Sequence, residues 1–223
     1  MDYIVIYLLI LLIPLIAQIN INNTYSKFRG IKNGKGITGF EVAREILDKN
    51  GLSTMYVVET KGNLTDHYDP TQKVIRLSSD VFHGNSIAAV AVAAHECGHA
   101  IQDKEDYSWY KIRASLVPIV NFVTYAAYIF FAISVILQLA DLIGLSIVLV
   151  SCSLLFQVVT LPVEFDASKR GLAKLEEYGL IEGDEESGAS SVLRAAALTY
   201  LASLLSSILN LIRLIMVYDD RRK

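Results

Sequence analysis

Four apolar segments constrain the fold of this 223-residue chain more than any other feature. They are Ile4–Ile19, Leu116–Ala140, Leu142–Val163 and Ala195–Ile212. A helix needs about 20 apolar residues to cross a bilayer, so the second and third segments predict transmembrane helices. The composition agrees with a membrane protein, because 53% of the residues are hydrophobic and only 19% are charged.

The first and fourth segments differ from this simple pattern. No positive residue precedes Ile4–Ile19 and no small-residue cleavage site follows it, so we predict a retained anchor, not a removed signal peptide. The fourth segment contains serines and Asn210, and we predict either a span or a helix at the membrane interface. The sequence therefore predicts three or four transmembrane helices.

The spacing of the apolar segments fixes which polar regions share a face of the membrane. Only a short turn at Asp141 separates the second and third segments, so residues 20–115 and 163–191 must lie on the same side. Most of the lysines and arginines lie in residues 20–115, which places both regions in the cytoplasm by the positive-inside rule. We predict a multi-pass protein of the plasma membrane. A spanning fourth segment would put the basic residues 221–223 outside, which leaves its placement open.

Residues 20–115 have the pattern of a small α+β unit. Thr38 and Glu41 form a capping-box pattern that predicts a helix from residue 40 to Asn50-Gly51. Residues 55–60 predict a strand, and residues 64–68 and 73–77 predict a hairpin around a turn at 69–72. A further helix is predicted from Val81 to Asp103.

The last of these helices contains the pattern His95-Glu96-Cys97-Gly98-His99. Histidines four residues apart in a helix point from one face, so both can bind one metal ion, and zinc is the usual choice. Glu96 stands beside that face, where it can act as a general base toward a metal-bound water without being a ligand. The apolar run before His95 is too short for a span, so we predict a site beside the membrane.

The other two histidines do not supply an obvious third ligand. His83 precedes His95 by about 18 Å along a helix, and His67 lies in the predicted hairpin. We therefore look for a carboxylate from the second cytoplasmic region. Glu164 is the first candidate, because it follows the third span directly. Asp166 is the second, either as a ligand or as a partner that orients a ligating imidazole.

Two blocks of sequence resemble a known family. Residues 67–102, HYDPTQKVIRLSSDVFHGNSIAAVAVAAHECGHAIQ, and residues 161–171, LPVEFDASKRG, resemble the YugP-like membrane zinc metallopeptidases, also called neutral zinc metallopeptidase family 2. That family is similar to the gluzincins, in which a downstream glutamate completes the zinc site. The resemblance implies one Zn²⁺ per chain, with His95, His99 and Glu164 as ligands and Glu96 as catalytic base. Related membrane proteases usually carry aspartate where this chain has Ser168.

Together these features predict a fold class and a division of the chain. The class is a mainly α membrane protein with three or four transmembrane helices and a small α+β zincin-like cytoplasmic domain. The division is an N-terminal anchor (1–22), a metallopeptidase unit (23–115), a transmembrane hairpin (116–163), a cytoplasmic segment with the third ligand (164–191), and a fourth apolar helix with a basic tail (192–223).

The predicted function is a membrane-anchored zinc endopeptidase that acts on protein or peptide substrates. The alternative is a non-catalytic scaffold or adaptor whose zinc is structural, although structural zinc sites usually have four protein ligands. A metal-dependent transporter is a weaker alternative, because the spans carry no charge relay. The net charge of −3 predicts no nucleic-acid partner, and the sequence leaves the oligomeric state open.

Overall fold

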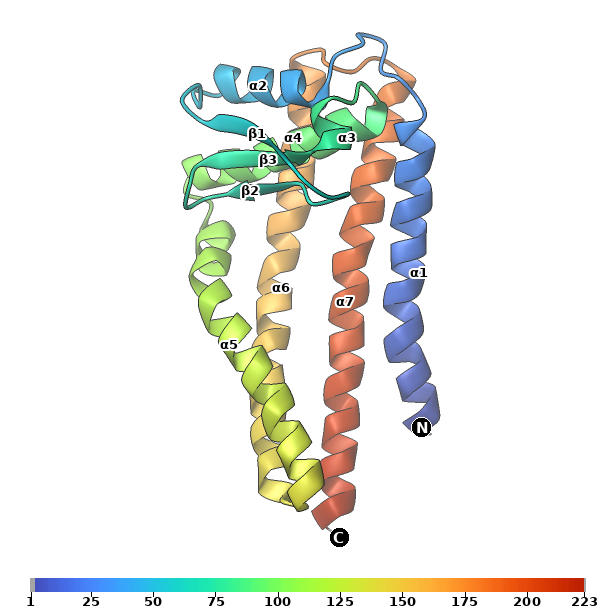
Figure 1. Ribbon diagram of the computed structural model, residues 1–223, viewed down its shortest axis with the longest axis vertical. Helices are drawn as coiled ribbons and strands as arrows, with labels where there is room; N and C mark the ends of the chain where they lie inside the picture. Colours follow the sequence, from blue (N-terminus) through green and yellow to red (C-terminus); the bar gives the residue numbers. More distant parts are fainter. Residues whose placement is uncertain (1–2, 223) are drawn as a thin grey trace. The chain divides into compact units, whose positions relative to one another are not determined.

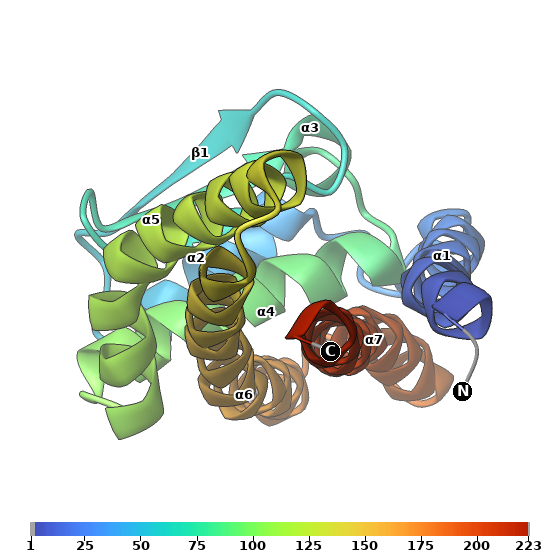
Figure 2. The ribbon, with the colours of Figure 1, turned by 90° about the horizontal axis from the view of Figure 1, so that it is seen from below.

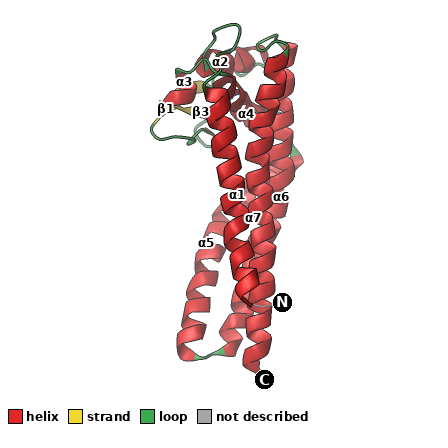
Figure 3. Ribbon diagram, turned by 90° about the vertical axis from the view of Figure 1, so that its right-hand side faces the viewer, coloured by secondary structure: helices red, strands yellow, loops and turns green. Residues whose placement is uncertain are grey.

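The computed structural model describes residues 3–222, and most of them are helical (Figure 3). The helices are α1 (Tyr3–Arg29), α2 (Gly39–Lys49), α3 (Ser79–Phe82), α4 (Ile87–Lys104), α5 (Ser108–Leu137), α6 (Ala140–Glu177) and α7 (Asp184–Arg222). The strands are β1 (Tyr56–Thr60), β2 (His67–Asp69) and β3 (Val74–Ser78) (Figure 1). The chain divides into two compact units.

The apolar unit consists of the chain up to Gln18, Lys111–Pro162 and the chain from Leu198 onward. Its helices are joined by polar side chains. Thr124 on α5 hydrogen-bonds Ser153 on α6 at 2.7 Å, and Gln157 on α6 donates to Ser207 on α7 at 2.8 Å. Arg213 on α7 donates to the Tyr7 hydroxyl on α1. These bonds give the order α5, α6, α7, α1, which Figure 2 shows end-on.

Helices α1, α5, α6 and α7 are each long and apolar enough to cross a membrane. The fourth apolar segment meets this criterion along with the other three, as part of α7. Many large apolar side chains in the apolar unit are exposed, including Phe122 (75%) and Ile136 (77%). Exposed apolar surface on this scale is typical of helices that face lipid.

Helices α6 and α7 both extend beyond their apolar segments. Pro162 lies near the end of the third apolar segment, and α6 runs unbroken through it and on through Ala167. Proline removes a single backbone hydrogen bond, and the packing of the following turns on α4 holds the helix together. The acidic residues 184–186 form the first turn of α7, where the helix dipole favours carboxylates.

The mixed unit consists of Ile19–Tyr110 and Val163–Ala197. Its three-stranded sheet has the order β1-β3-β2, with β1 parallel and β2 antiparallel to β3. The predicted strand at 55–60 and the predicted hairpin are confirmed. Asp69 closes the hairpin turn, because its Oδ1 accepts hydrogen bonds from the backbone N–H groups of Thr71 and Gln72.

The predicted capping box of α2 is also confirmed, since Thr38 and Glu41 bond each other's backbone N–H groups.

The single helix predicted from Val81 to Asp103 is wrong, because the structure contains α3 and α4 with a break at residues 83–86. Gly84 lies so close to the Asp80 carbonyl that a side chain would not fit there. Ser86 then begins α4 by accepting a hydrogen bond from the N–H of Ala89.

Helix α4 is the centre of the mixed unit, and almost all of its residues are buried. Its small side chains let α2, β2 and the turns of α6 that follow Val163 approach closely. Where α4 and α6 cross, a side chain at Gly98 would overlap the backbone of Ala167, and one at Gly171 would overlap the backbone of Ala94. This close crossing fixes which residues of α6 face the motif on α4.

Candidate metal centre

Helix α4 presents His95 and His99 from one face, as residues one turn apart must be. Their ring centroids are 4.8 Å apart and the ring planes are almost perpendicular, at 82°. The side chains are 15% and 9% exposed, respectively. Both imidazoles are therefore largely shielded from solvent while their Nε2 atoms point toward α6.

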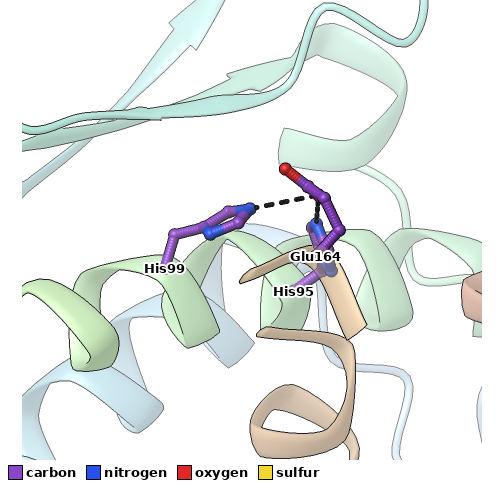
Figure 4. Close-up of side chains that lie close together, drawn as sticks. All are labelled: His95, His99 and Glu164. Carbon is purple, nitrogen blue, oxygen red and sulfur yellow. Dashed lines mark ion pairs between the residues drawn. The ribbon is translucent and has the colours of Figure 1, made fainter. Parts of the chain in front are cut away.

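Glu164 of α6 faces the two imidazoles across the helix crossing (Figure 4). Its side chain is only 3% exposed, and its Oε2 lies 3.3 Å from His95 Nε2 and 3.5 Å from His99 Nε2. One potential ligand atom from each of the three residues lies within 4.8 Å of the others. The structure thus brings together the three residues that the sequence predicts as ligands.

The spacing of these atoms fits a zinc ion. Zn–N and Zn–O bonds of about 2.0–2.1 Å in a tetrahedron place neighbouring ligand atoms about 3.3–3.4 Å apart. The two nitrogen–oxygen distances of 3.3 and 3.5 Å agree with that edge. A direct charge-assisted hydrogen bond would be shorter, about 2.7–2.9 Å. Two imidazoles and one carboxylate also form a donor set that zinc accepts readily.

Each imidazole is held from behind by a polar side chain. His95 Nδ1 lies 3.1 Å from the hydroxyl oxygen of Ser168, and His99 Nδ1 lies 3.1 Å from Oε1 of Gln102. Because Nε2 of each ring faces Glu164, we assign the proton to Nδ1, which then donates to these oxygens. Such bonds fix the tautomer and orientation that a metal-binding imidazole requires.

Gln102 connects both sides of the candidate centre. Its side chain is fully buried, and its Nε2 donates to the Val163 carbonyl at 2.8 Å and to Asp166 Oδ2 at 2.9 Å. The same carboxylate of Asp166 binds Arg170. Asp166, the second candidate for the third ligand, is therefore absent from the group of three and instead holds Gln102. One amide positions His99 and also the backbone next to Glu164.

Glu96, the predicted general base, is buried on the same helix, 7% exposed. The pKa of its carboxyl is raised to about 7, mainly by burial and also by the nearby Glu164 carboxylate, although His95 and a backbone hydrogen bond from Tyr68 act to lower it. The Tyr68 contact places strand β2 beside Glu96. A cation bound nearby would favour the ionised carboxylate that a general base needs.

The remaining histidines have partners elsewhere in the mixed unit. His83 Nε2 lies 3.3 Å from Glu59, and His67 Nδ1 lies 2.8 Å from the Thr65 carbonyl. Cys97, inside the motif, is buried with its thiol 3.7 Å from the Ala43 carbonyl of α2. None of these side chains belongs to the group around Glu164 in the described residues.

Sequence reasoning did not assign roles to Gln102 and Tyr110. The Tyr110 ring lies 6.3 Å from the His99 ring, centroid to centroid, and is almost completely buried. Helical spacing could have indicated Gln102, which lies three residues after His99, and also the contact of Ser168, which lies four residues after Glu164. No comparable signal in the sequence connects Tyr110 to the motif.

Comparison with known proteins agrees with this geometry. Residues 3–219 match the family described as "Putative neutral zinc metallopeptidase". The chain belongs to this family. A Bacillus subtilis (strain 168) protein named "Putative membrane protease YugP" is 44% identical over 206 residues, which cover 92% of each chain. No solved structure matches the chain significantly. The family description implies zinc, and His95, His99 and Glu164 form a group that could hold it.

Proposed function

We propose that this protein is a membrane-anchored zinc endopeptidase whose reaction takes place in the mixed unit. The observation that carries the proposal is the convergence of His95, His99 and Glu164 beside the buried Glu96. In this proposal the three residues bind one Zn²⁺, and Glu96 is the general base. The four apolar helices anchor the protein in the plasma membrane, and the mixed unit faces the cytoplasm.

Zinc in this position would polarise the scissile carbonyl and lower the pKa of a coordinated water. The carboxylate of Glu96 accepts a proton from the attacking water and delivers it to the leaving amine. The N–H of Tyr68 holds that carboxylate in place. Ser168 and Gln102 keep the two imidazoles oriented, so the ligand atoms need no rearrangement when the metal binds.

The edge of strand β2 is the surface to which we expect a peptide substrate to bind. Within residues 3–222 this strand pairs with β3 along one side only, and its Tyr68 backbone reaches Glu96. An extended peptide that pairs with the other side of β2 would bring its backbone toward the proposed base. We therefore propose extended segments of unfolded or membrane proteins as substrates.

The alternative of a scaffold with a structural zinc has less support. Within residues 3–222 the group contains three protein ligands, which leaves the fourth zinc position for water, as in catalytic sites. A structural site would also have no need for a buried glutamate beside the ligands.

Glu96→Gln separates the two functions. The purified full-length variant should bind one zinc per chain and fail to cleave unfolded casein, because an amide cannot accept the proton. Glu45→Gln, on the exposed face of α2, is a matched control that should cleave like the unmodified protein. Equal cleavage by the Glu96→Gln variant would defeat the proposal.

A further inference from the structure

A groove lies between α6 and α7 in the mixed unit, away from the three candidate ligands. Its volume is about 240 Å³. Phe165, Leu172, Leu193 and Ala197 provide apolar walls, and Lys169 and Arg194 provide two cations. The groove thus combines apolar surface with concentrated positive charge.

The two cations of the groove lack anionic partners in the described part of the chain. Lys169 and Arg194 are both exposed, and neither forms an ion pair or a side-chain hydrogen bond there. Their neighbours differ: Arg170 pairs with Glu105 and Asp166, and Lys174 pairs with Glu177. Two unneutralised cations in one apolar groove form a site for an anion that also carries apolar groups.

The sequence places this groove at the membrane surface. Phe165 comes two residues after the end of the third apolar segment at Val163, and its side chain is 50% exposed. Arg194 directly precedes the fourth apolar segment, which begins at Ala195. Both walls therefore belong to turns at which a helix meets the bilayer, where lipid phosphates are abundant.

We propose that this groove binds the headgroup of an anionic phospholipid. Lys169 and Arg194 contact the phosphate, and Phe165 contacts the first part of an acyl chain. A peptide substrate fits the groove less well, because none of the three candidate zinc ligands lines it. The site stands independently of the proposed peptidase activity, although Ser168 lines the groove and also contacts His95.

The test is native mass spectrometry of the full-length protein in detergent, titrated with phosphatidylglycerol or phosphatidylcholine. The unmodified protein should retain one phosphatidylglycerol tightly and show no comparable site for phosphatidylcholine. Removing one interfacial cation should weaken binding about 5-fold, so Lys169→Gln with Arg194→Gln should weaken it about 30-fold. The conservative pair Lys169→Arg and Arg194→Lys should restore it.

Lys49→Gln with Lys61→Gln removes the same charge elsewhere on the mixed unit, and this control should bind like the unmodified protein. Millimolar inorganic phosphate should not displace the lipid, because it lacks the acyl chain. Undiminished phosphatidylglycerol binding by the Lys169→Gln, Arg194→Gln variant would overturn the proposal. The proposal would also be overturned, in favour of a peptide site, if an acidic peptide displaced bound phosphatidylglycerol at a lower concentration than added phosphatidylglycerol does.

Discussion

Replacing Gln102 with leucine tests whether this amide organises the candidate metal centre. Leucine has nearly the same volume and no polar atoms, so the change removes hydrogen bonds without opening a cavity. Asp166 keeps its bond to Arg170, but His99 Nδ1 loses the oxygen that Gln102 provides. A buried donor deprived of its partner costs about 1–3 kcal/mol.

That cost should appear mainly as weaker zinc binding, because the lost hydrogen bond is the one that orients the ligand His99. Loss of a residue that supports a metal ligand typically lowers affinity about 10- to 100-fold. This equals about 1.4–2.8 kcal/mol, in agreement with one lost bond to a buried imidazole. Zinc affinity is measured by competition with a chromophoric chelator, and thermal unfolding of the metal-free protein is followed in parallel.

Two further variants test whether the loss of zinc affinity comes from the hydrogen bond between Gln102 and His99. Gln102→Glu keeps an acceptor for His99 and should recover zinc affinity relative to Gln102→Leu. Its charge next to Asp166 should still lower the unfolding temperature. Gln72→Leu, on the exposed hairpin turn, should leave zinc affinity unchanged. A folded Gln102→Leu protein that binds zinc within twofold of the unmodified protein would show that Gln102 does not organise the metal centre.

Four other changes have distinct expected outcomes. Gly98→Ala should lower the free energy of unfolding by about 1–3 kcal/mol and also weaken zinc binding, because the added methyl group pushes α4 away from α6; chemical denaturation and chelator competition measure both effects. Thr38→Ala should cost about 1 kcal/mol of stability through the lost cap of α2 and leave zinc affinity unchanged, as the same two assays report. Ser168→Ala should weaken zinc binding about tenfold or less, measured by chelator competition. Removing zinc with a chelator should abolish casein cleavage yet leave the circular dichroism of the helices largely intact, since the core around α4 is apolar; loss of helical signal would contradict this.

Local sequence signals predicted much of the mixed unit correctly. The capping box at Thr38 and the turn at Asp69 act within a few residues, so their consequences could be inferred without knowledge of the fold. The continuation of α6 past Pro162 could not be inferred from the local sequence, because it depends on packing against α4. The break at Gly84 depends likewise on a close backbone contact.

In the candidate metal centre, too, local features follow from the sequence, and others depend on how the helices pack. The spacing of His95 and His99 follows from helical periodicity alone. Glu164 and Asp166 lie close together in the sequence, and periodicity could not decide which one reaches the imidazoles. The register of the α4–α6 crossing decides it, because Gly98 packs on Ala167 and turns Glu164 toward the histidines.

X-ray absorption at the zinc edge of the purified protein tests whether His95, His99 and Glu164 bind zinc. We expect four nitrogen or oxygen ligands at about 2.0–2.1 Å, with the signature of two imidazoles. Glu164→Gln should lower zinc affinity and change this spectrum. A sulfur ligand at about 2.3 Å, as Cys97 would provide, or a spectrum unaffected by Glu164→Gln would show that these three residues do not hold the zinc.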